Sequence, residues 1–254
     1  MEHLMYKNFK LRVRNKLLNI LFDLHFQPRH WVHTVKYSLE DTGMPSQRLL
    51  DLTKKAYEFT MENNLESIKS SRMKEGINHI ELEQISFFPG AHYRILNGIV
   101  RSLNPKRVVE IGTWTGVSSL AILDGALSEE FKLTTFDIVP WNTINHTALI
   151  QDDFGVHFEQ KLADLSNREV FQEHKDVFQE AELIFIDGPK DGIFEYKLVE
   201  YFKELNFDNN PIIFFDDINQ IEMLNLWHDI EKPKFDITSL GQFTGTGLID
   251  WIKS

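Results

Sequence analysis

The sequence predicts an α/β protein with a Rossmann-like, doubly wound sheet that is mostly parallel, closes with an antiparallel C-terminal hairpin and follows an N-terminal helical extension. From residue 90 onward, short apolar runs rich in β-branched and aromatic residues alternate with helical segments. One run leads into the turn Gly112–Gly116, and two others open directly into aspartate. Ligands of such sheets bind at the carboxyl ends of the strands, where these glycines and aspartates would lie.

Length and composition set the outer limits of the protein. We divide the 254 residues into a helical extension over 1–80 and a main domain over 81–254. The net charge of −11 argues against nucleic acid as a partner. The lack of cysteine excludes disulfides, thiolate metal sites and cysteine nucleophiles. The sequence has neither a transmembrane run nor a signal-peptide core, so we expect a cytoplasmic protein.

The extension is expected to be helical. Its first helix carries apolar residues at helical spacing, namely Val13, Leu17, Leu21 and Leu24. Residues 1–33 have a net charge of about +4, from six basic and two acidic side chains. This helix either lies on a membrane surface or a partner, or packs on its own domain or on the second subunit of a homodimer; we favour packing. A second helical stretch is expected near Pro45–Lys69.

The main domain begins after the break at Pro89-Gly90. We expect helices over Tyr93–Leu103 and Val117–Leu127. Buried strands are expected over Arg107–Ile111, Leu133–Ile138, Leu183–Ile186 and Ile212–Phe215, with a further strand ending near Asp164. The closing hairpin is expected over Phe235–Leu240 and Gly247–Ile252.

The segment from Glu110 to Ser119 stands at the first strand-to-helix junction. Gly112 and Gly116 let the backbone turn sharply and approach a ligand, and the helix that follows offers free N–H groups to a carboxylate or phosphate. An ordinary turn between strand and helix is the alternative. Trp114 stands where a dinucleotide motif has its second glycine, which argues against an NAD-dependent oxidoreductase.

Charge in this loop favours S-adenosyl-L-methionine as the cofactor. Glu110 provides a carboxylate for the ammonium group of the methionine part, and Ser118 and Ser119 provide hydroxyl donors for its carboxylate. A neutral, apolar loop is usual where NAD binds, so the acidic side chain separates the two ligands.

Residues after the next two strands complete the predicted cofactor site. Asp137 can accept hydrogen bonds from both ribose hydroxyls, although helix capping is the simpler role. Ile138 and Trp141 either pack on adenine or fill the core, and Asp164 either binds the adenine amino group or caps a helix. The predicted cofactor residues are Glu110, Gly112, Thr113, Trp114, Gly116, Ser118, Asp137, Ile138, Asp164 and Asp187.

Three aspartates follow two strands that we expect to be neighbours. Asp187, Asp216 and Asp217 would then lie close together and would repel one another unless protonated or bridged by a cation. Oxygen ligands without His or Cys favour Mg²⁺, with other divalent cations as alternatives. Helix capping would account for the aspartates without a metal. Asn219 is a further candidate near the site.

Lys190 lies three residues beyond Asp187, on the same predicted loop. Beside a metal ion the pKa of a lysine can fall, so that its amine can take a proton from a substrate hydroxyl. Lys190 and Asp187 are therefore the predicted catalytic residues. An ion pair with Asp191 on the protein surface is the alternative role of Lys190.

The motifs together resemble the metal-dependent catechol and caffeoyl-CoA O-methyltransferases, which are class I S-adenosylmethionine-dependent methyltransferases. Glu-Ile-Gly-Thr-Trp-Thr-Gly-Val-Ser is similar to their cofactor motif, and Ile-Phe-Ile-Asp-Gly-Pro-Lys-Asp-Gly to their metal-and-lysine loop. Phe-Phe-Asp-Asp stands where that family has Asp-Asn, and the double aspartate is closer to the related sugar O-methyltransferases. The resemblance covers residues 90–220.

The resemblance implies a divalent-metal-dependent transfer of a methyl group to a hydroxyl of a small molecule, either a phenol or catechol or a sugar. It implies that Asp187, Asp216 and Asp217 bind Mg²⁺ and that Lys190 is the base. A metal-independent enzyme that methylates nitrogen or another acceptor, an NAD-dependent oxidoreductase and a non-catalytic cofactor-binding subunit are the alternatives. Candidates for the acceptor pocket, each with an equal structural role, are His92, Tyr93, Trp141 and the loop 242–245.

Overall fold

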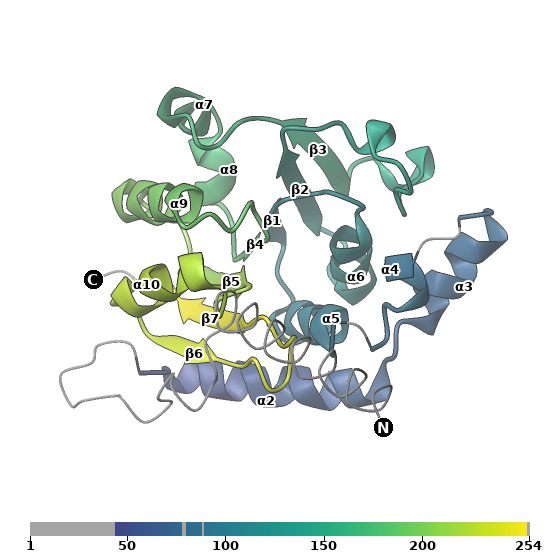
Figure 1. Cartoon of the computed structure of the whole chain (residues 1–254), viewed down its shortest axis with the longest axis horizontal. Helices are drawn as coiled ribbons and strands as arrows, with labels where there is room; N and C mark the ends of the chain where they lie inside the picture. Colours follow the sequence, from purple (N-terminus) through teal and green to yellow (C-terminus); the bar gives the residue numbers. More distant parts are fainter. Residues whose placement is uncertain (1–43, 78–79, 88, 253–254) are drawn as a thin grey trace, which may run out of the picture.

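The structure, a computed structural model, describes residues 44–77, 80–87 and 89–252. Its centre is a seven-stranded sheet with the order β3-β2-β1-β4-β5-β7-β6 (Figure 1). The strands are β1 (Arg107–Ile111), β2 (Lys132–Asp137), β3 (Phe158–Leu162), β4 (Leu183–Ile186), β5 (Ile212–Asp216), β6 (Lys234–Asp236) and β7 (Thr246–Asp250).

The first five strands are parallel, and β7 runs antiparallel to both of its neighbours. The mostly parallel sheet with an antiparallel C-terminal hairpin is therefore confirmed. From β1 the chain adds β2 and then β3 on one side, and it then crosses back to add β4 and β5 on the other side of β1. This change of side places the switch point between β1 and β4. Ligands bind at such a switch point, on the side of the carboxyl ends.

Each central strand is buried on both faces, which explains why the strands appear as continuous apolar runs. Val108 and Phe185 belong to one hydrophobic core, while their chain neighbours Val109 and Ile184 belong to another. The side chains of a strand alternate between its faces, so one core lies on each side of the sheet.

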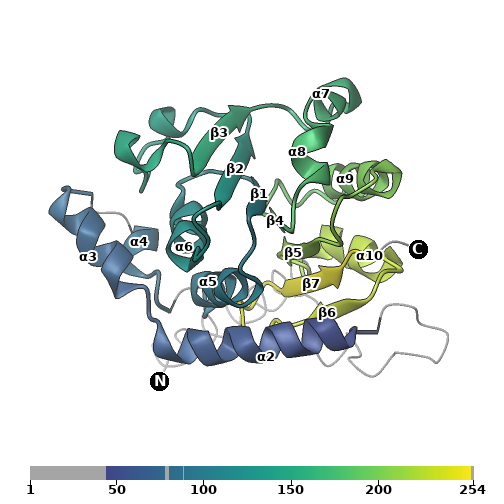
Figure 2. The same cartoon turned by 180° about the vertical axis from the view of Figure 1, so that it is seen from behind.

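Helices cover both faces (Figures 1 and 2). On one side lie α2 (Gln47–Glu62), α5 (His92–Leu103) and α6 (Val117–Gly125). On the other side lie α7 (Arg168–Glu173), α8 (Lys175–Gln179), α9 (Ile193–Glu204) and α10 (Ile221–Asp229). Shorter elements complete the described chain, namely α3 (Glu66–Lys74), α4 (Ile80–Glu83), η1 (Trp141–Thr143) and η2 (Gln151–Asp153).

The predicted helical stretch over 45–69 is two helices rather than one. Leu65 adopts the left-handed backbone conformation with φ 59°, which ends the regular path between α2 and α3. Its side chain is fully buried in the core, so burial of an apolar residue holds this turn.

Helix α2 packs closely on the main domain. The Cα of Gly98 in α5 approaches α2 so closely that a Cβ there would overlap the carbonyl oxygen of Ala56. At the start of α2, the Ser46 hydroxyl donates to Asp250 Oδ2 at 2.6 Å and Arg48 pairs with Asp250 Oδ1 at 2.7 Å. The helix thus contacts both α5 and the last strand.

Two predictions about the extension are not tested by these contacts. The division at residue 80 stays a prediction, and the basic helix around residues 13–24 lies outside the described residues. None of the described helices is long and apolar enough to cross a membrane.

Candidate active site

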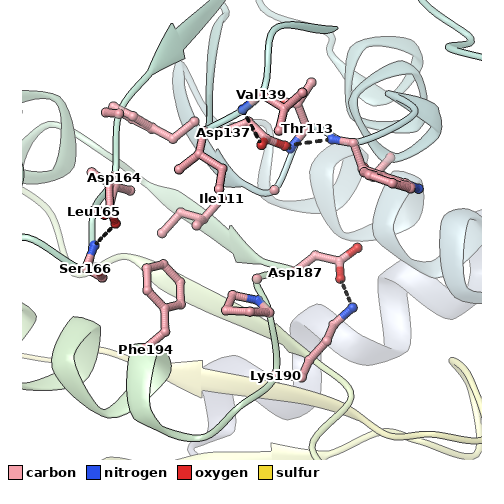
Figure 3. A pocket seen from close by; sticks show the side chains of 18 of the residues that line it. Ile111, Thr113, Asp137, Val139, Asp164, Leu165, Ser166, Asp187, Lys190 and Phe194 are labelled. Atoms are coloured by element: carbon pink, nitrogen blue, oxygen red, sulfur yellow. Dashed lines mark hydrogen bonds and ion pairs between the residues drawn. The ribbon is translucent and has the colours of Figure 1, made fainter. Parts of the chain in front are cut away.

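A cavity of about 720 Å³ opens at the carboxyl ends of β1, β2 and β4 (Figure 3). Eight of the ten predicted cofactor residues line it, namely Gly112, Thr113, Trp114, Ser118, Asp137, Ile138, Asp164 and Asp187. Glu110 and Gly116 are not among the residues that line this cavity. The catalytic candidate Lys190 lies on its wall, as do Tyr93 and Phe194.

The two glycines of the loop are required by its shape. Gly112 has φ 101°, and a Cβ there would overlap the carbonyl oxygen of Asp187 at the end of the neighbouring strand. Gly116 has φ 78°, and a Cβ there would collide with the side chain of Leu149. The loop can therefore pass this close to β4 and to Leu149 only with glycine at these two positions.

Asp137 holds the glycine loop from the end of β2. Its Oδ2 accepts hydrogen bonds from the backbone N–H groups of Thr113 at 2.9 Å and Trp114 at 3.0 Å, and its Oδ1 accepts from Val139 N at 3.0 Å (Figure 3). A carboxylate has about four acceptor positions, so capacity for a ligand hydroxyl remains on the side facing the cavity.

Glu110 lies behind the loop. It is fully buried, and the Ser118 hydroxyl donates to its Oε1 at 2.6 Å while the Ser119 hydroxyl donates to its Oε2. Burial raises the pKa of Glu110 to about 7, against the lowering effect of these hydroxyls. The expected arrangement, with both serine hydroxyls turned to the cofactor carboxylate, is not the one observed. Here the serines bind Glu110 and fix the first turn of α6 to β1.

The residues proposed for the adenine end occupy different positions. Ile138 lines the cavity with its side chain 70% exposed, whereas Trp141 stacks on Phe154 with ring centroids 4.8 Å apart. Asp164 lines the cavity and accepts a hydrogen bond from Ser166 N at 3.0 Å. The first turn of α7 is capped by Asn167, so Asp164 does not cap that helix.

The three aspartates meet at one point. One carboxylate oxygen from each of Asp187, Asp216 and Asp217 lies within 4.8 Å of the others. Burial raises the pKa of Asp216 well above its usual range, and the charges of the other two aspartates add to this effect. Asp191, not Asp187, accepts the N–H groups of the first turn of α9, which removes the capping explanation for Asp187.

Lys190 completes this cluster. Its Nζ lies 2.5 Å from Asp187 Oδ1 and 3.0 Å from Asp217 Oδ2, and the alternative, a surface pair with Asp191, is not observed. Burial alone would lower the pKa of Lys190, but the charges of the aspartates outweigh burial and raise it. Without a cation, the cluster therefore favours an ammonium group among the carboxylates, and the fall of this pKa beside a metal ion stays a prediction.

Two residues support the site although the sequence analysis assigned them no role. Glu195 is buried in the first turn of α9, and its carboxylate accepts hydrogen bonds from Lys190 N at 2.9 Å and Gly192 N at 3.1 Å. The spacing from Gly192 to Glu195 is that of the glutamate half of a capping box, and Gly192 has no side chain to supply the other half. Gln160 donates to Thr113 Oγ1 at 3.0 Å from β3, a contact without a local sequence signal.

Two of the candidates for the acceptor pocket, Tyr93 and His92, lie in different places. Tyr93 lines the cavity, while His92 is buried behind it with Nδ1 3.5 Å from Asp216 Oδ1. Asn219 is buried as well, and its amide donates to Thr238 Oγ1 at 3.4 Å.

Comparisons with known proteins match part of the chain to a family and its fold to solved structures. Residues 109–218 match the family described as a methyltransferase domain. The fold is similar to the O-methyltransferase TomG from Streptomyces achromogenes, which is involved in tomaymycin synthesis and was solved with S-adenosylmethionine (15% identity, TM-score 0.50, covering 75% of this chain and 90% of that chain). The S-adenosylhomocysteine-bound methyltransferase PaMTH1 from Podospora anserina aligns with 17% identity and a TM-score of 0.47, over 80% of this chain and 88% of that chain.

The comparison with curated proteins gives no match. The matched segment runs from β1 to just beyond β5, and so includes both the glycine loop and the three aspartates. Residues 109–218 thus match a methyltransferase domain, and the sheet order and the cavity belong to a fold that is similar to that of solved O-methyltransferases.

Proposed function

We propose that the protein is a divalent-metal-dependent O-methyltransferase that acts on a hydroxyl group of a small molecule, a catechol or phenol or a sugar. The observation that carries this proposal is the position of Lys190, which lies on the wall of the cofactor cavity and belongs to a cluster with three aspartates. An enzyme that methylates an uncharged amine has no need of an acidic cluster at this place.

The cavity fits S-adenosylmethionine, which supplies an electrophilic methyl group. The backbone of Gly112 and Thr113 and the carboxylate of Asp137 would hold the ribose and methionine parts, with Ile138 and Asp164 at the adenine end. The N-terminus of α6 adds unpaired N–H groups, which favour a carboxylate. Glu110 would act indirectly, by holding Ser118 and the start of α6.

The aspartate cluster fits a divalent cation such as Mg²⁺. All its donors are carboxylate oxygens, and three ionised aspartates with one lysine leave an excess of two negative charges. A bound cation supplies charge neutralisation and lowers the pKa of a hydroxyl placed beside it. Asp187, Asp216 and Asp217 are the residues that would hold it.

Lys190 is the proposed base. Once the aspartate charges are neutralised, burial favours the neutral amine, and Lys190 Nζ can accept the proton of the acceptor hydroxyl. The acceptor oxygen then bonds to the methyl carbon as the carbon–sulfur bond breaks, giving a methyl ether and S-adenosylhomocysteine. Tyr93 and Phe194 line the same cavity and provide apolar walls for a small acceptor.

The cellular setting is also a proposal. The absence of cysteine supports a reducing compartment, and we propose that the protein acts in the cytoplasm. We retain residues 81–254 as the catalytic domain and a homodimer as a candidate assembly.

The test is a methyl-transfer screen against catechols and sugar diols, with and without EDTA. We expect turnover to be lost with EDTA and restored by Mg²⁺. An EDTA-insensitive enzyme would favour the metal-independent alternative. Calorimetry with S-adenosylhomocysteine and NADH separates the remaining alternatives, since an oxidoreductase would bind NADH and a non-catalytic subunit would bind S-adenosylhomocysteine without turnover.

A further inference from the structure

One buried side chain bridges the two aspartates that follow β5. Gln242 is only 5% exposed, and its Nε2 donates to Oδ1 of Asp216 and, at 3.2 Å, to Oδ1 of Asp217. A carboxamide nitrogen carries two protons, so a single Gln242 can satisfy one oxygen of each carboxylate.

The sheet topology brings Gln242 to this place. Because β7 runs antiparallel to β5, its first residue Thr246 pairs with Asp216, the last residue of β5 (Figure 1 shows the two strands side by side). The loop that precedes β7 must therefore cross the carboxyl end of β5. Asp217 N donates to Gly245 O at 2.8 Å, which ties the loop to the aspartate whose backbone is left-handed at φ 60°.

The loop is also fixed on its other side. Gln242 forms an isolated β-bridge with Gly90, and Ala91 N donates to Gly241 O at 3.0 Å. Gln242 N donates to Thr246 Oγ1 at 3.2 Å. The carboxamide is thus held in place by the protein alone, before a ligand binds.

The contacts separate the two oxygens of Asp217, and on Asp216 they involve Oδ1. Gln242 takes Oδ1 of both aspartates, and His92 Nδ1 lies on the same side, 3.5 Å from Asp216 Oδ1. The opposite oxygen of Asp217, Oδ2, is the one that contacts Lys190 Nζ at 3.0 Å. A neutral amide also leaves the negative charge of the pair available to a cation, which a lysine or arginine at position 242 would cancel.

We propose that Gln242 is a positioning residue for the divalent cation: its amide holds the Oδ1 atoms of Asp216 and Asp217 so that their Oδ2 atoms face the site. This inference rests on the proposed metal dependence. Groups that orient metal ligands in this way are typically worth about 10–100-fold in metal affinity.

The experiment measures Mn²⁺ binding to the full chain by electron paramagnetic resonance, in the absence of any acceptor. Two variants remove the amide with different shapes, Gln242→Met and Gln242→Leu, so that a shared loss belongs to the missing donor rather than to packing. The matched control is Thr244→Val, on the same loop, because the buried Thr244 hydroxyl has no hydrogen-bond partner among the described residues. Calorimetry with S-adenosylhomocysteine reports whether each variant keeps its cofactor cavity.

We expect both Gln242 variants to bind Mn²⁺ about 10–100-fold more weakly, with unchanged affinity for S-adenosylhomocysteine, and Thr244→Val to behave as wild type. Variants that bind Mn²⁺ as wild type does would overturn the role of Gln242 and leave the proposed function standing. A wild-type chain that binds S-adenosylhomocysteine but no Mn²⁺ would overturn both. An equal loss in Thr244→Val would assign the effect to the loop fold and overturn the role of the amide.

Discussion

The buried Glu110 gives a measurable pH dependence of stability. Its pKa is about 7 in the folded protein against an ordinary value of 4.5. Each pKa unit corresponds to about 1.4 kcal/mol, so the ionised form is disfavoured in the fold by about 3 kcal/mol. Between these two pH values the unfolded chain has released this proton and the folded chain has not. The contribution of Glu110 to the free energy of unfolding therefore falls by this amount as the pH rises from 4.5 to 7.

Replacement of Glu110 by Gln isolates that contribution. The amide keeps the shape of the side chain and hydrogen-bonding partners for Ser118 and Ser119, because their hydroxyls can donate or accept. We expect the stability of the variant relative to wild type to rise by about 3 kcal/mol between the two pH values. Urea unfolding across this range measures the difference, with Glu129→Gln at an exposed position as the control. Parallel stability curves for Glu110→Gln and wild type would refute the reasoning.

Two further predictions follow from the described contacts. Lys190→Ala should lower the rate of methyl transfer by about 10²–10⁴-fold and leave the affinity for S-adenosylhomocysteine unchanged, because Lys190 is the proposed general base; unaltered turnover would exclude it as the base. Gly98→Ala should destabilise the protein by about 1–3 kcal/mol, because the added Cβ would overlap the Ala56 carbonyl oxygen. Thermal unfolding checks this, with Gly155→Ala as a control because a Cβ at Gly155 meets nothing within 4 Å; equal melting temperatures would contradict it.

The central strands were predictable because burial on both faces makes each of them an unbroken apolar run. The aspartate cluster was predictable for a related reason, since parallel strands end at one edge of the sheet and carry Asp187 and Asp216 to the same place. By contrast, β3 lies at the sheet edge and has a mixed sequence, Phe-Glu-Gln-Lys-Leu, which shows no apolar run. Only its end near Asp164 was expected.

Other parts of the site depend on contacts that local sequence does not encode. The sequence predicts that Glu110 lies near Ser118 and Ser119 at the strand-to-helix junction. It does not determine whether the two hydroxyls face a ligand or the glutamate. The bridge from Gln242 to Asp216 joins residues 26 positions apart and follows from the register of β7, which the sequence alone does not specify.

Because the antiparallel strand β7 completes the site, the cofactor half and the cation half of the site are synthesised at different times. A ribosome delivers the glycine loop and Asp137 well before residues 241–245. A nascent chain could thus form the cofactor half of its sheet while the amide bridge over β5 is still missing. Under the proposed role of Gln242, cation affinity would then depend on the docking of β7.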